Sequence, residues 1–228
     1  MKIAELYEMQ KALDARIIEQ KGLQGVDLLP NTVLALQVEI AELANEWRGF
    51  KHWSTRQTPT VEMELCDYCR EAADYTRPTP FMADVGAQMC KGCWDMTKTE
   101  YAASDEEYIG DFEDYPHFPK KEPKKLLEEY ADCLHFFLSI ARQLELTEND
   151  LFVPDDFLEG DTVINFTELL HHVGQIQLDP KRRHSFFRLA LFVFYTLGDQ
   201  KFGFSYDQIT SAYVAKNKTN YDRLAVGY

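Results

Sequence analysis

The chain has 228 residues, of which 45% are hydrophobic, and a formal net charge of −14. This length suits one domain with an addition, and the apolar content is that of a folded protein with a sizeable core. The excess of acidic residues disfavours polymeric nucleic acid and anionic membranes as partners, because both bind through cationic side chains. No apolar run reaches the roughly 18 residues of a membrane-spanning helix, and the N-terminus has no apolar stretch typical of a signal peptide. We therefore expect a cytoplasmic protein without a membrane partner.

The first fifty residues predict two amphipathic helices. Apolar residues from Leu6 to Ile17 recur at helical spacing, and Gly22 ends that run. Pro30 then opens a second apolar stripe, which reaches Trp47. Each helix is expected to bury its apolar face against the rest of a helical domain.

Residues 57–123 have a different composition, with little helical periodicity and four cysteines arranged in two pairs. These are Cys66, Cys69, Cys90 and Cys93. Their spacing is typical of a four-thiolate zinc site, and disulfides are disfavoured in a chain without a secretion signal. Structural Zn2+ is the main interpretation, and free or redox-active thiols are the alternative. Cys133, the fifth cysteine, lies in an apolar segment and is expected to be a small buried residue.

The same segment is strongly acidic near its end. Seven acidic residues and no Lys or Arg lie between Glu100 and Phe118. The simplest interpretation is a solvated linker, and a docking module that does not bind nucleic acid is the alternative.

Helical periodicity resumes at residue 124 and continues to the C-terminus. Further helices are expected at about 164–177, 183–200 and 206–220, and Val and Ile are too sparse for a sheet. The predicted fold is all-α: a helical bundle formed by residues 1–56 and 124–228, interrupted by the 57–123 insertion.

Carboxylates recur at helical spacing on two of these helices. Glu39, Glu42 and Glu46 share one helix face beside an apolar stripe, and Glu129 and Asp132 repeat the arrangement after the insertion. Several inward carboxylates require a cation, and an all-oxygen site suits Mg2+ or Mn2+. The alternative is a solvated face or a set of intrahelical salt bridges, which is the commoner fate of helical Glu.

Cations that could meet phosphate lie near predicted helix ends. They are Lys51, Lys216, Lys218 and Arg223. In so acidic a chain these residues are candidate anion contacts, and ordinary surface charge is the alternative.

Three segments carry a resemblance to a known family. LALQVEIAELANEWRGFKHWS, LLEEYADCLHFFLSIA and AYVAKNKTNYDRLAVGY resemble the dimeric dUTPase family of the all-α NTP pyrophosphohydrolases. The resemblance covers residues 1–56 and about 124–228. It implies Mg2+-dependent hydrolysis of dUTP, and also of dUDP, with dUMP and pyrophosphate formed from dUTP, and a homodimer in which the neighbouring subunit helps to complete the pocket.

The resemblance also assigns roles to individual residues. Glu39 and Glu42 of the ExxE motif and Glu129 and Asp132 of the ExxD motif would bind the metal, with Glu39 activating the attacking water. The implied nucleotide contacts are Gln10, Asp14, Trp53, Lys216, Asn217, Asn220 and Arg223. Gln10 would face the uracil, and Asp14 stands where some members have Asn. The 57–123 insertion departs from the family, and we assign its zinc no chemistry.

Two other functions remain open from the sequence. A ferritin-like di-iron carboxylate protein would use a Glu-x-x-His motif, which Glu168 and His171 provide and which Asp132 and His135 imitate. A zinc-stabilised interaction protein on an inactive scaffold is the second alternative.

Overall fold

The computed structural model describes residues 2–59, 64–73, 76–103, 109–115, 124–154 and 156–227. The chain divides into two compact units, Met1–Thr60 with Lys125–Tyr228, and Val61–Lys124. Much of the expected acidic linker, residues 104–108 and 116–118, lies outside the described residues.

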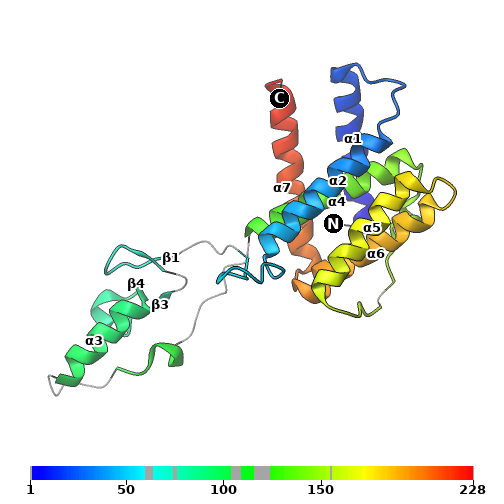
Figure 1. The fold of residues 1–228 in the computed structure, drawn as a ribbon. Helices are drawn as coiled ribbons and strands as arrows, with labels where there is room; N and C mark the ends of the chain where they lie inside the picture. Colours follow the sequence, from blue (N-terminus) through cyan, green and yellow to red (C-terminus); the bar gives the residue numbers. More distant parts are fainter. Residues whose placement is uncertain are drawn as a thin grey trace. The chain divides into compact units, whose positions relative to one another are not determined.

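The first unit is built from helices, as the all-α prediction requires (Figure 1). They are α1 (Ile3–Lys21), α2 (Leu29–Trp47), α4 (Lys124–Gln143), α5 (Thr162–Leu178), α6 (Arg183–Thr196) and α7 (Tyr206–Ala225). A 3-10 turn, η3 (Glu148–Leu151), and a π-helical turn, η4 (Leu197–Lys201), complete the unit. Helix α6 ends four residues earlier than expected, because the following residues form the wider π-helical turn η4.

Local signals in the sequence explain where these helices begin and end. Pro30 lies in the first turn of α2, where its missing N–H costs no hydrogen bond. The side chain of Asp161 accepts a hydrogen bond from Val163 N at the start of α5, and Ser205 accepts one from Gln208 N at the start of α7. The helix boundaries are therefore largely encoded in neighbouring residues.

The core of this unit gathers around α4, which buries apolar residues along most of its length. Helix α5 packs on both α6 and α2, and α1 packs on α7 (Figure 1). Tyr130 stacks on Phe194 with ring centroids 4.1 Å apart and donates a hydrogen bond to the Phe194 carbonyl oxygen at 3.1 Å. Cys133 is fully buried in this core, as predicted.

The second unit contains short strands and one helix. Strand β1 (Glu64–Leu65) pairs antiparallel with β2 (Ala72–Ala73), and β3 (Thr76–Pro78) pairs antiparallel with β4 (Gln88–Cys90). Helix α3 (Lys91–Ala103) follows β4 directly, and the 3-10 turns η1 (Met82–Asp84) and η2 (Phe112–Asp114) lie on either side of it in sequence. The low periodicity of this segment did not predict α3.

Candidate active site

Three carboxylates from two helices meet in the first unit. Glu39 lies on α2, and Glu129 and Asp132 lie three residues apart on α4. Each residue offers one oxygen atom, and these oxygens all lie within 4.8 Å of one another. All three side chains are half-buried. The expected juxtaposition of the two acidic motifs is therefore present for three of the four residues.

Burial and neighbouring acidic charges raise the pKa values of all three carboxylates. Burial is the largest cause for Glu39, followed by the charges of Asp132, Glu42 and Glu129, and its pKa rises to about 7. Burial and neighbouring acids also raise the pKa of Glu129. The pKa of Asp132 rises through burial, although Lys216 opposes the change. Such a cluster favours binding of a divalent cation, and its all-oxygen donor set fits a hard ion such as Mg2+ or Mn2+.

Glu42 differs from the expectation that all three acids of α2 point partly inward, whereas Glu46 agrees with it. Glu42 is exposed and is not one of the three clustered carboxylates, although its charge acts on Glu39 and Glu129. Glu46 is buried, and its carboxylate lies 3.5 Å from Lys125 Nζ. Glu42 lies about 60° around the helix axis from Glu39, and the rotation of α2 leaves Glu42 on the solvent side of that axis.

Helix α7 brings cations to the same cluster. Lys216 Nζ donates a hydrogen bond to Asp132 Oδ2 at 2.5 Å, and the charge of Arg223 also acts on Asp132. Asn217 is buried beside Lys216, and its Nδ2 has no hydrogen-bond partner among the described residues. Asn220 is half-buried one turn further along the helix, whereas Lys218 is exposed. Cationic and amide groups of α7 thus lie beside the acids of α4.

A buried polar network lies one helical turn away and joins α1, α4 and α7. Gln10 Oε1 accepts a hydrogen bond from Tyr213 Oη at 2.8 Å and lies 2.7 Å from His135 Nδ1. Gln10 Nε2 donates to Asp14 Oδ1 at 2.8 Å. The other carboxylate oxygen of Asp14 accepts from Ser139 Oγ and from Arg142 Nε, each at 2.7 Å.

This network fixes the orientation of the Gln10 carboxamide. Its oxygen already accepts from Tyr213, and the opposite orientation would place that oxygen against the Asp14 carboxylate. His135 Nδ1 must therefore carry a proton and donate it to Gln10. Burial lowers the pKa of His135 to about 3, which is consistent with a neutral ring. The sequence pattern did not identify His135 and Tyr213 as partners of Gln10, although each lies three residues from a predicted site residue on its own helix.

Lys51 and Trp53 lie in the loop after α2. They line a cavity of about 600 Å³ together with residues of the α2 end and the following loop. Trp53 is 68% exposed, so one face of its ring is accessible for stacking. Lys51 Nζ donates to Asn45 Oδ1, which ties the loop to α2.

Comparison with known protein families adds an independent observation. Residues 2–70 and 106–228 match the family described as dUTPase. The chain belongs to the all-α dUTPase family. This membership supports dUTP hydrolysis in general and a nucleotide as the substrate. A comparison with curated proteins found no match.

The segments that match the dUTPase family contain the carboxylate cluster, the buried Gln10 network and the cations of α7. The match omits residues 71–105. This unmatched segment is shorter than the predicted 57–123 insertion, so residues 57–70 and 106–123 at the two ends of the insertion also match the family. None of the described helices is long and apolar enough to cross a membrane.

The dUTPase match does not favour a di-iron protein, and neither does the geometry. In the part of the chain that the structure describes, the clusters of potential metal ligands are the three carboxylates and the four cysteines. Glu168 and His171 belong to neither cluster.

Proposed function

We propose that the chain hydrolyses dUTP to dUMP and pyrophosphate, and accepts dUDP, at a Mg2+ site formed by Glu39, Glu42, Glu129 and Asp132. The observation that carries the proposal is the meeting of three carboxylates from α2 and α4 with Lys216 from α7. The dUTPase family match supports the same reaction. Bound Mg2+ would neutralise phosphate charge and lower the pKa of a water molecule.

Glu39 acts as the general base in this proposal. Its carboxylate is half-buried beside Glu129 and Asp132, so it lies where it would take a proton from a water molecule held at the metal. The water oxygen attacks one of the two phosphorus atoms joined by the α–β bridging oxygen, and the bond from that phosphorus to the bridging oxygen breaks. Glu39 takes the proton of the water, and the products are dUMP and pyrophosphate. Lys216 and Arg223, with Lys51 from the loop, balance the negative charge of the phosphates.

The order of polar groups along α4 and α7 sets the orientation of the bound nucleotide in this proposal. The Asp132–Lys216 pair marks the phosphate end, and the Gln10 network one turn away marks the base end. Trp53 supplies an aromatic wall for the nucleoside, and Asn217 and Asn220 supply amide groups beside and beyond Lys216 on α7.

The fixed Gln10 carboxamide explains how uracil would be selected. Its oxygen is occupied by Tyr213 and His135, so Gln10 can offer a base only the second N–H of Nε2. Uracil O4 accepts such a hydrogen bond, whereas the 4-amino group of cytosine is itself a donor and would be mispaired. Asp14 supports this selection by holding the first N–H of Nε2.

We also propose that the protein is a homodimer. Leu34 and Val38 lie one turn apart on α2 and are 62% and 48% exposed, which is unusual for neighbouring apolar side chains. Glu42 follows at the same four-residue spacing, so a subunit packed on this face would bury Glu42 beside the cluster. Light scattering of the purified protein should give twice the chain mass.

The test of the proposed activity is a panel of the four common dNTPs together with dUTP, each incubated with Mg2+. Pyrophosphate and dUMP should appear from dUTP at a much higher rate than the products of dCTP or dTTP. Absence of pyrophosphate release from dUTP, or equal turnover of dCTP, would overturn the proposal. Measurement of bound iron separates it from the di-iron alternative, and turnover separates it from an inactive scaffold.

A further inference from the structure

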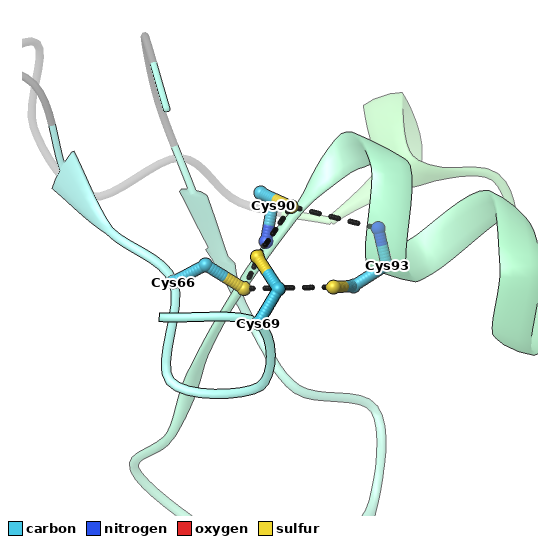
Figure 2. A group of neighbouring side chains, drawn as sticks. All are labelled: Cys66, Cys69, Cys90 and Cys93. Carbon is cyan, nitrogen blue, oxygen red and sulfur yellow. Dashed lines mark hydrogen bonds between the residues drawn. The ribbon is translucent and has the colours of Figure 1, made fainter. Parts of the chain in front are cut away.

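The four cysteines of the second unit converge although they lie in separate segments (Figure 2). Cys66 and Cys93 have their Sγ atoms 3.8 Å apart, and the Sγ atoms of Cys69 and Cys90 are 3.9 Å apart. These distances are far longer than the roughly 2.05 Å of a disulfide. Four sulfurs placed about 2.3 Å from a Zn2+ ion in a tetrahedron lie about 3.8 Å from one another. The sulfur spacing is therefore that of a tetrathiolate metal site.

The first cysteine pair lies on a tight turn that holds both thiols on one side. Arg70 N donates to the Cys66 carbonyl oxygen at 2.9 Å, and Cys66 N donates to the Glu71 carbonyl oxygen at 3.0 Å. Arg70 adopts a left-handed conformation with φ of 61°, which disfavours a residue with a side chain. The two backbone hydrogen bonds hold the turn in this conformation.

The second pair lies where β4 runs into α3. Cys90 ends the strand, and Cys93 lies in the first turn of the helix. Asp67, inside the first turn, donates its N–H to the Gln88 carbonyl oxygen at 2.8 Å and accepts from Gln88 N at 2.7 Å. The strand that carries Cys90 is thereby tied to the turn that carries Cys66.

Backbone N–H groups also point at the sulfurs. Cys90 N donates to Cys66 Sγ at 3.3 Å, and Cys93 N donates to Cys90 Sγ at 3.5 Å (Figure 2). These two hydrogen bonds tie the end of β4 and the first turn of α3 to the sulfur cluster. The backbone thus helps to bring the cysteines together.

The cluster also forms much of the core of its unit. Cys66 and Cys93 are buried together with Met89, Trp94 and Phe112, and this small group makes up the buried apolar cluster of the described part of the unit. So small a core rarely stabilises a fold without a metal ion or a disulfide. Cys69 is exposed, so one corner of the cluster faces solvent.

We propose that Cys66, Cys69, Cys90 and Cys93 bind one Zn2+ ion that holds the second unit in its fold. All four ligand positions are filled by the protein, so the ion has no open position for a substrate and its role is structural. The proposal is independent of dUTP hydrolysis, because the four cysteines are separate from the carboxylate cluster.

Metal analysis of the purified full chain tests the ligand set. The wild type should contain one zinc ion per chain, and Cys69→Ser should lose most of it without removing a buried side chain. Cys69→His should retain zinc, because imidazole is also a zinc ligand and the position is exposed. Cys133→Ala is the matched control, and it should retain zinc because Cys133 lies in the helical unit. Absence of zinc in the wild type, or full retention in Cys69→Ser, would overturn the proposal.

Two further measurements test the chemistry and the role. Cobalt exchanged into the zinc site should show strong thiolate-to-metal charge-transfer absorption, which a carboxylate site does not produce. Removal of the zinc should increase hydrogen exchange in residues 88–103 while α4 keeps its protection. Unchanged exchange in residues 88–103 after zinc removal would overturn the structural role, and disulfides in the freshly purified protein would overturn the site itself.

Discussion

Lys216 Nζ lies 2.5 Å from Asp132 Oδ2, and this pair joins α7 to α4. One turn away on the same two helices, His135 stacks on Tyr213 with ring centroids 3.9 Å apart. The two contacts form successive links between the helices, the first beside the carboxylate cluster and the second beside Gln10. The spacing between them is thus set by the helical repeat, which makes the distance between the phosphate and base ends of the proposed site insensitive to loop conformation.

Neighbouring glutamates on α4 give a matched test of the metal site. Glu129→Gln should lower dUTP turnover by more than about 100-fold, because loss of even an outer partner of a metal ligand costs 10- to 100-fold. Glu128→Gln makes the same chemical change at an exposed position and should leave turnover within about twofold. Pyrophosphate release measured over a range of Mg2+ concentrations distinguishes the two, and similar losses in both variants would contradict the cluster.

Glu42 tests whether an exposed residue completes the site. Glu42→Gln should also abolish most of the turnover while the protein keeps its helical circular dichroism, because Glu42 is assigned as a ligand and contributes no core packing. Near-normal turnover would reduce the metal site to the three clustered carboxylates.

Divalent cations should stabilise the protein through the cluster. Mg2+ or Mn2+ at 100 times the dissociation constant should add about 2.7 kcal/mol to the free energy of unfolding. Glu39→Gln should increase stability without added metal, because it removes one of three mutually repelling carboxylates, and it should weaken the response to metal. Thermal melts with and without each cation measure both effects. A wild-type response that persists fully in Glu39→Gln would be the contrary result.

His135 should make stability depend on pH. Burial lowers its folded-state pKa to about 3, below the unfolded value of about 6.5, so the unfolded chain binds the proton more strongly. The contribution of the neutral ring to the free energy of unfolding is complete above pH 6.5. It decreases by about 1.4 kcal/mol per pH unit as the pH falls from 6.5 toward 3. Urea unfolding of the wild type and His135→Phe between pH 7 and pH 5 should show the difference between them shrinking or reversing. Parallel pH profiles would show that His135 is accessible to protons in the folded state.

Gly198 should be intolerant of a side chain. A Cβ atom at this position would lie 2.5 Å from both Cζ and Oη of Tyr130. Gly198→Ala should therefore cost about 1–3 kcal/mol in the free energy of unfolding, and it should lower turnover because Tyr130 adjoins Glu129. Tyr130→Leu removes both Cζ and Oη and should reduce the cost of Gly198→Ala in a double-mutant cycle. Additive effects would show that the two residues do not meet.

The sequence predicted the elements whose signals are local. Helix spacing indicated that Glu39, Glu129 and Asp132 would face one another. Gly22 and Pro30 located the end of α1 and the start of α2. Helix α3 was missed because its charged and small residues form no apolar stripe, and its buried side chains pack on a turn distant in sequence. The exposure of Glu42 depends on the rotation of α2 against α4, which a periodic pattern alone does not determine.

The Gln10 network shows a second limit. The network joins residues of three different helices, and most of its members lie more than one hundred residues apart in the chain. They are Gln10, Asp14, His135 and Tyr213. No rule based on sequence spacing therefore predicts that they meet. Each is an ordinary polar residue on an amphipathic helix until the tertiary packing removes water from it. Burial then makes every unpaired polar group costly, and the network follows from that cost.

The contact between Lys216 and Asp132 has a consequence for how a phosphate would be received. An ammonium group has three N–H donors, and Asp132 engages one, so two remain for an incoming anion. A free lysine loses up to about 2 kcal/mol of side-chain entropy when it is ordered, and this loss normally weakens ligand binding. In this fold the hydrogen bond to Asp132 already orders the Lys216 side chain. Binding of a phosphate would therefore cost less side-chain entropy than binding to an unrestricted lysine.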